Sequence, residues 1–155
     1  MTQFIEYTLY SRKLITTAGE YSFFGSIAGN TNIKKPNSIP SNWIKFEIML
    51  MKVYVDIPFT YSLKFIESYF SFILSQNTLI NIHMLEALNA PFCLEHTNMS
   101  PIKFISQSFD NFYKFEPPIV IKPDMSFDVK LNTNVNLFTN VVVALKGIVE
   151  RKIIG

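Results

Sequence analysis

The last third of the chain restricts the fold most, because it holds three extended segments with little sequence between them. Residues 119–121 form a β-branched run behind Pro117 and Pro118, and residues 127–131 alternate apolar and polar side chains. That period of two is typical of a half-buried strand. Residues 139–149 form a longer run rich in valine. Parallel neighbours would need a crossover of about a dozen residues or more, so this region predicts antiparallel strands, in a meander or a Greek key.

Extended segments are also expected upstream. Residues 3–10 carry apolar or aromatic side chains at both odd-numbered and even-numbered positions, which predicts a strand covered on both sides. Residues 20–27, 43–55 and 78–85 predict three more strands, and the second of these is long enough to contain a bulge. Residues 61–72 instead place apolar side chains at helical spacing, which predicts a short helix.

Two long connections separate these elements. Residues 28–42 are rich in asparagine and show no periodicity, and residues 90–116 are irregular apart from a cluster of aromatic side chains. No internal repeat or linker divides the chain. The prediction is therefore a single domain over residues 1–155 that is mainly β: an antiparallel β-sandwich, jelly-roll-like, with seven or eight strands and one short helix.

The composition is apolar for a chain of 155 residues, since 48% are hydrophobic, 15% are aromatic and only 17% are charged. A membrane span, a large core or a surface covered by partners would each account for this. A spanning helix needs about 20 predominantly apolar residues, and the best candidate, residues 57–74, contains Pro58, Lys64 and Glu67. We therefore expect no transmembrane segment, and the start of the chain lacks the pattern of a secretory signal.

The formal net charge is +2, and the basic residues are scattered rather than gathered in a run. A nucleic-acid-binding domain usually carries a marked basic excess, so no specific nucleic-acid binding is predicted. The single cysteine, Cys93, excludes an intrachain disulfide. Folding is therefore not expected to depend on an oxidising compartment.

Metal sites are a natural expectation for a β-sandwich, because cupin-type sandwiches bind metal through clustered histidines and glutamates. Cys93 and His96 have a C-x-x-H spacing, with His83, Glu86 and Glu95 nearby in sequence. A structural zinc site needs about four ligands, usually in two paired motifs, and the second pair is missing. The simpler interpretation is that Cys93 is a small buried apolar residue. No metal site and no cofactor are predicted.

Catalytic patterns are equally scarce. The sequence allows a Cys93–His96 dyad, but residues three apart on a loop rarely form one, and the apolar neighbours of Cys93 would raise the pKa of its thiol. Gly25 and Gly29 lack the lysine and the following helix of a phosphate-binding loop and predict a turn. The twelve carboxylates form no informative pair. The chain is therefore predicted not to be an enzyme and to have no catalytic residue.

Aromatic side chains can also stack on sugars or bases when they are exposed, and Tyr54, Tyr61, Tyr113 and Phe115 are candidates. Most aromatic residues are nevertheless expected in the core. One alternative function is a carbohydrate-binding β-sandwich module for a receptor or glycan, with an aromatic platform near Trp43 or Tyr113. A cupin-like enzyme is a further alternative, and it requires convergent histidine and glutamate side chains.

Three stretches resemble jelly-roll structural proteins of bacteriophages. They cover residues 21–152 in outline, although glycine-rich turns are lacking. The stretches are Phe23-Phe24-Gly25 with Asn30-Thr31-Asn32-Ile33, then Phe46-Glu47-Ile48, and finally Pro118-Ile119-Val120-Ile121, Phe127-Asp128-Val129-Lys130-Leu131 and Val143-Ala144-Leu145-Lys146-Gly147-Ile148-Val149-Glu150-Arg151.

The resemblance implies a virion structural protein: a subunit of a capsid shell, or a component attached to a capsid or tail. Such a protein assembles in the host cytoplasm with copies of itself and with other virion proteins, so a homo-oligomer is expected. A monomer of this size exposes roughly 8,000 Å², and several contacts of about 800 Å² each would cover much of it. The low charge and the many aromatic residues suit such a surface. Residues 28–42 and 90–116 are the expected contact loops.

Overall fold

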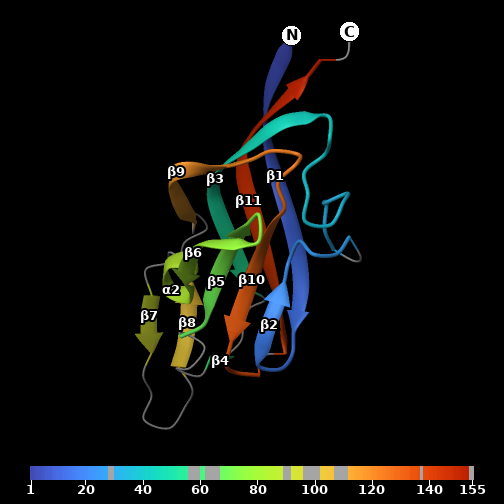
Figure 1. The fold of residues 1–155 in the computed structure, drawn as a ribbon. Helices are drawn as coiled ribbons and strands as arrows, with labels where there is room; N and C mark the ends of the chain where they lie inside the picture. Colours follow the sequence, from blue (N-terminus) through green and yellow to red (C-terminus); the bar gives the residue numbers. More distant parts are fainter. Residues whose placement is uncertain are drawn as a thin grey trace.

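Two antiparallel sheets of four strands form most of this protein in the computed structural model, which describes residues 1–27, 30–55, 60–61, 67–88, 92–95, 102–106, 112–136 and 138–153 (Figure 1). The predicted antiparallel β-sandwich is therefore confirmed. Sheet A has the strand order β1-β11-β3-β9, and sheet B has the order β2-β10-β5-β6. A third, small sheet has the order β4-β8-β7.

The strands of sheet A are the longer ones, and the two longest, β1 and β11, pair along their whole length. Sheet A consists of β1 (Thr2–Ile15), β11 (Thr139–Lys152), β3 (Trp43–Val55) and β9 (Tyr113–Ile121). Sheet B consists of β2 (Gly19–Ser22), β10 (Phe127–Thr133), β5 (Tyr69–Leu74) and β6 (Asn77–His83). The small sheet consists of β4 (Thr60–Tyr61), β8 (Ile102–Ser106) and β7 (Phe92–Glu95).

The core lies between sheets A and B and combines aliphatic with aromatic side chains. Phe127, Val129 and Leu131 of β10 are buried in it, as the period of two predicts. The rings of Phe24 and Phe127 lie 5.4 Å apart between centroids. Full burial of one such side chain stabilises the fold by about 1.5 to 3 kcal/mol. The almost completely buried phenylalanines are Phe23, Phe24, Phe46, Phe70, Phe72 and Phe127, so the core holds much of the aromatic excess.

Strand β3 has the predicted bounds and also the predicted bulge. Its pairing with β9 shifts register between Ile48 and Leu50, and its pairing with β11 shifts between Lys146 and Gly147. Gly147 is required here, because a Cβ at that position would lie 2.9 Å from the Cα of Ile48 and closer still to the carbonyl of Glu47. The backbone of β3 thus lies too close to Gly147 to leave room for a side chain there.

The prediction that the first strand is covered on both sides is wrong. Ile5, Tyr7, Leu9 and Ile15 face the core, but the opposite parity is exposed, and Phe4 keeps 63% of its surface accessible. The free edge of β1 is partly capped, because residues 30–32 run beside it. Arg12 N donates to Asn30 O at 2.9 Å, and Asn32 N donates to Tyr10 O at 3.3 Å.

The predicted helix over residues 61–72 is wrong for its described part. Strand β5 begins at Tyr69, and Phe70 and Phe72 are both buried, which is the period of a strand. The described residues hold one helix, α2 (Met84–Leu88), where the sequence predicted the end of a strand. Met84 and Ala87 of α2 are buried, and the helix contacts strands of both large sheets, so it closes the sandwich near β6 and β9.

The C-terminal strands do not form a meander, because β9 and β11 belong to sheet A and β10 to sheet B. Pro117 and Pro118 lie within β9 rather than before it. They fall between the paired residues Lys114 and Ile119, where β9 departs from the ladder with β3. Proline is tolerated there because no ladder N–H is required and β9 is an edge strand.

The two predicted connections contain more structure than expected. Strand β2 ends at Ser22, and the following loop sends Phe23 and Phe24 into the core. Within residues 30–42, Ile33 and Ile39 are buried. Asn37 exchanges two hydrogen bonds with Phe127, because Phe127 N donates to Asn37 O and Asn37 Nδ2 donates to Phe127 O. Residues 90–116 include β7, β8 and the start of β9.

Candidate functional site

The outer face of sheet A exposes large apolar side chains from three neighbouring strands. Leu14 is 57% exposed and Tyr54 50%, and Tyr10 is 43% exposed. We call this surface the apolar face; its large exposed residues are Phe4, Tyr10, Leu14, Tyr54 and Ile148. The charged atoms of Lys45 and Glu150 lie 3.8 Å apart on this face. Register places seven charged residues on the same face: Glu6, Arg12, Lys45, Glu47, Lys52, Lys146 and Glu150. The surface is thus amphipathic, as interfaces between protein subunits are.

The outer face of sheet B is polar instead. Register places four side chains in one row across β2, β10, β5 and β6: Glu20 lies opposite Asn132, Asn132 opposite Tyr69, and Tyr69 opposite His83. A second row follows the same strands with Ser22, Lys130, Ser71 and Asn81. We call this surface the polar face. Side chains directly opposite each other in antiparallel strands lie about 5 Å apart, so each row forms one continuous surface.

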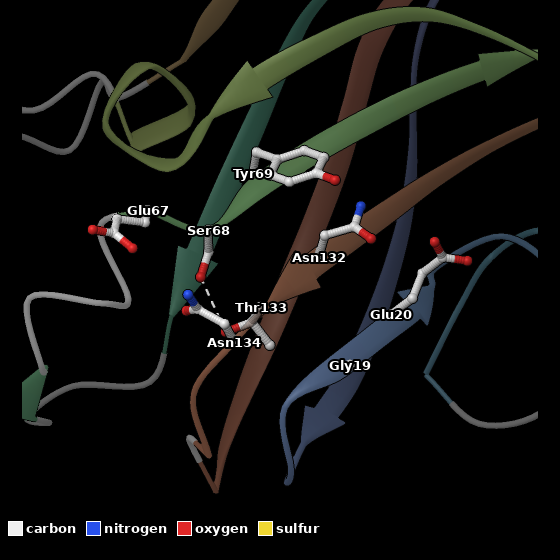
Figure 2. A pocket seen from close by; sticks show the side chains of 8 residues that line it. All are labelled: Gly19, Glu20, Glu67, Ser68, Tyr69, Asn132, Thr133 and Asn134. Carbon is white, nitrogen blue, oxygen red and sulfur yellow. Dashed lines mark hydrogen bonds between the residues drawn. The ribbon is translucent and has the colours of Figure 1, made fainter.

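A pocket of about 370 Å³ opens at one end of the polar face, and Figure 2 shows it from close by. The side chains of Tyr69, Asn132 and Glu20 stand next to one another on β5, β10 and β2 (Figure 2). Tyr69 is 40% exposed. The described residues that line the pocket are Gly19, Glu20, Glu67, Ser68, Tyr69, Asn132, Thr133 and Asn134.

The floor of this pocket is fixed by hydrogen bonds between its strands. Ser68 Oγ donates to Thr133 Oγ1 at 3.0 Å, and both residues are buried. Val135 N donates to the same Thr133 oxygen at 3.4 Å. The loop after β10 is held as well, because Ala18 N donates to Asn136 Oδ1 at 2.9 Å. The pocket is therefore built from positioned groups rather than from a loose loop.

The charge at the pocket is negative. Glu20 and Glu67 line it, and no described lining residue is basic. Lys130, in the adjacent row, donates to Glu20 at 3.0 Å, which orients that carboxylate without removing it from the pocket. An anionic ligand would approach two carboxylates here, whereas a ligand rich in hydroxyl donors would find acceptors.

A second cavity, of about 350 Å³, is an apolar groove along β6 and β9, where the two sheets come together at one edge. Leu79, Tyr113 and Pro118 are among the residues that line it. At its rim the exposed Lys114 ammonium lies 2.8 Å from the Glu116 carboxylate. This hydrogen bond, together with the charge of Lys114, lowers the pKa of Glu116, and the same contact raises the pKa of Lys114.

The aromatic residues singled out from the sequence lie in different surroundings. The predicted platform at Trp43 is wrong, because this side chain is buried, with Tyr7 5.0 Å away between ring centroids and Phe46 5.7 Å away. Phe115 is buried and Tyr113, packed against it, is half-buried. Tyr54 is exposed, but on the apolar face.

The residues weighed for metal binding are spread over several elements. His83 ends β6, Glu86 lies in α2, and Cys93 and Glu95 lie in β7. His96 lies outside the described residues, as does Gly29 of the glycine pair; Tyr61 belongs to β4. Among the described residues, no three histidine, cysteine, aspartate or glutamate side chains come together as metal ligands would.

Sequence reasoning missed Tyr69, the aromatic residue of the pocket. A helical reading of residues 61–72 placed it on the same buried stripe as its neighbours. The usable signal was the alternation of Tyr69 and Ser71 with Phe70 and Phe72, which marks a strand with one polar side.

No protein-family model and no curated protein matches this chain. In the described part of the chain, no helix has the length and apolar character needed to cross a membrane.

Proposed function

We propose that this chain is a jelly-roll structural subunit of a bacteriophage particle, in the capsid shell or attached to a capsid or tail. It acts by assembling with copies of itself and with other virion proteins. The protein is then a component of the virion, assembled in the host cytoplasm. The observation that carries the jelly-roll part of the proposal is the pairing of the eight strands in sheets A and B.

These eight strands pair from the two ends of the chain inwards. The first pairs with the last (β1 with β11), the second with the seventh (β2 with β10), the third with the sixth (β3 with β9), and the fourth with the fifth (β5 with β6). A jelly roll is an eight-stranded double sheet made of two Greek keys. These four pairs, together with the contacts of β11 with β3 and of β10 with β5, support the proposal of a jelly roll.

The apolar face supports assembly as the mode of action. Single exposed apolar residues are normal, but a group of them on one rigid sheet favours a contact with another protein. The accessible surface of the chain is 9103 Å². A standard contact takes about 800 Å² from each partner, so a subunit can make several such contacts and still leave the polar face open.

The fold alone does not select this function, because jelly rolls also occur in lectins and cupins. The resemblance of the sequence to phage structural proteins favours the virion, and the apolar face favours a protein that acts through contacts.

The test is the state of association. Light scattering after size-exclusion chromatography, over a wide range of concentrations, should give a mass above 17.9 kDa that rises with concentration. Mass spectrometry of purified particles from cells that express the chain should recover it in stoichiometric amounts. A monomer at the highest concentration, together with its absence from particles, would contradict the proposal.

A further inference from the structure

We propose that the pocket at the end of the polar face binds one neutral pyranose unit of a glycan, with Tyr69 as its stacking platform. The inference does not rest on assembly, because every residue it uses belongs to one copy of the chain. It adds a ligand-binding site on the surface opposite to the apolar face.

The first support is the position of Tyr69. Tyr69 is 40% exposed on the outer face of sheet B, and its partners in the row, Asn132 and His83, carry side chains that can form hydrogen bonds (Figure 2). A pyranose has one face rich in C–H groups and a rim of hydroxyl groups. The C–H face packs on an exposed aromatic ring through dispersion and polarisation, as bases and cations do. The hydroxyl rim then needs polar partners beside the ring.

The second support is the set of polar groups around that ring. Asn132 and Asn134 offer amides, each with donor and acceptor atoms, and Glu20 and Glu67 offer carboxylates that only accept. Sugar hydroxyls both donate and accept, so they match such a mixed set. The volume of about 370 Å³ lies at the lower end of the range for small-molecule sites, roughly 300 to 1,000 Å³. One sugar ring, rather than an extended chain, suits that size.

The third support is the charge, which distinguishes sugars from other ligands that stack. Nucleotides carry phosphates that need basic partners. No described lining residue is basic, and Lys130 in the adjacent row is paired with Glu20. Sialic acids and uronic acids are disfavoured for the same reason. An extended peptide usually binds along the edge of a sheet, and this pocket opens on the face of sheet B.

Preorganisation completes the site. Lys130 holds Glu20, and Ser68 holds Thr133 at the floor. Asn132 Nδ2 lies 3.5 Å from Ser71 Oγ, in the next row. These contacts hold part of the site before a sugar binds, which lowers the entropic cost of binding.

The experiment uses the full chain and defined probes. Saturation-transfer NMR is recorded with the methyl glycosides of glucose, galactose, mannose and N-acetylglucosamine, and with sialyllactose. At least one neutral glycoside should receive saturation, and its dissociation constant is then measured by titration. The sialic acid ring of sialyllactose should receive none.

Variants locate the site. Tyr69→Ala should weaken binding of the best neutral glycoside by at least tenfold, whereas Tyr69→Phe, which keeps the ring, should stay within about threefold. Asn132→Ala should weaken it by several-fold. Tyr54→Ala is the matched control, because it removes a similarly exposed tyrosine from the apolar face. Circular dichroism and the unfolding midpoint show whether each variant is folded.

Two results would overturn the site. One is that none of the four neutral glycosides binds the wild-type chain. The other is that Tyr69→Ala, shown to be folded, binds as well as the wild type. Neither result changes the oligomeric mass or the recovery from particles, so failure of this site and failure of the proposed assembly are told apart.

Discussion

Sheets A and B share one core but present different outer faces. Inside, both supply phenylalanine and aliphatic side chains to the same layer. Outside, sheet A exposes large apolar residues such as Phe4, Leu14 and Tyr54 among charged ones, whereas sheet B presents rows of amides, hydroxyls and charges around Tyr69. Burial restricts the inner side chains of both sheets to apolar residues. The outer side chains are not restricted in this way, so they can differ according to the function of each face. Contacts with proteins suit the first face, and a hydrated ligand suits the second.

The largest effect is expected at Gly147, where the backbones of β11 and β3 meet beneath the apolar face. Gly147→Ala places a methyl group against the backbone of Glu47 and Ile48, which cannot move aside as a flexible side chain would. Overpacking usually costs about 1 to 3 kcal/mol, and we expect the upper end, measured by urea unfolding. Ile148→Ala, the exposed neighbour, is the control and should cost much less. A loss below about 1 kcal/mol at Gly147 would show that the two strands separate easily.

The next effect concerns Asp128, which ties sheet B to the loop after β2. This buried carboxylate accepts from Phe24 N at 2.9 Å, from Val129 N at 2.8 Å and from Ser22 Oγ. Asp128→Ala leaves the buried Phe24 N–H without its acceptor, and we expect a loss of about 2 kcal/mol in unfolding free energy. Asp128→Asn retains one oxygen for Phe24 and should lose less. Equal losses in the two variants would mean that the charge, rather than the acceptor, holds the loop.

Introducing a charged residue on the apolar face tests whether this face mediates self-association. Leu14→Glu and Tyr54→Glu should each weaken self-association by about tenfold, or about 1.4 kcal/mol, in analytical ultracentrifugation. Asn81→Glu, on the polar face, is the matched control and should leave association unchanged. Because all three side chains are exposed, stability should change by no more than about 0.5 kcal/mol. If Asn81→Glu disrupts association as strongly, the assignment of the two faces is wrong.

Sequence patterns predicted those features of the two sheets that depend on a single strand, such as its position in the chain and its buried side. Residues 43–55 and 127–131 show their strand period in the sequence, and both strands were found there. The division into sheets was not predictable in the same way, because β9, β10 and β11 alternate between layers through contacts with β3 and β5. A sequence period reports which side of a strand is buried, and it does not report the partner.

The pocket escaped prediction for the same physical reason. Its lining comes from β2, β5 and β10 and from residues that flank β5 and β10. The hydrogen bond at its floor joins Ser68 to Thr133 across 65 positions of the chain. Residues 61–72 fit a helical stripe and a strand at once, since several neighbouring apolar residues satisfy both periods. Packing of Phe70 and Phe72 against the core selects the strand and thereby turns Tyr69 outwards.

The smallest effect concerns the edge of the apolar face. Asn32 caps β1 with its side chain, since Tyr10 N donates to Asn32 Oδ1 at 2.8 Å and Asn32 Nδ2 donates to Thr8 O at 2.7 Å. Asn32→Ala removes both bonds, which are exposed, so a loss of about 1 kcal/mol is expected. It should appear as roughly fivefold faster hydrogen exchange at the Tyr10 amide. Asn77→Ala, which removes one exposed bond to Ser75 O in the turn between β5 and β6, should leave the exchange rate of the Tyr10 amide unchanged.

If the Tyr10 amide exchanges as slowly in Asn32→Ala as in the wild type, the backbone bond from Asn32 N suffices to cap β1. The side chain would then add nothing to the protection of this edge against unwanted strand pairing.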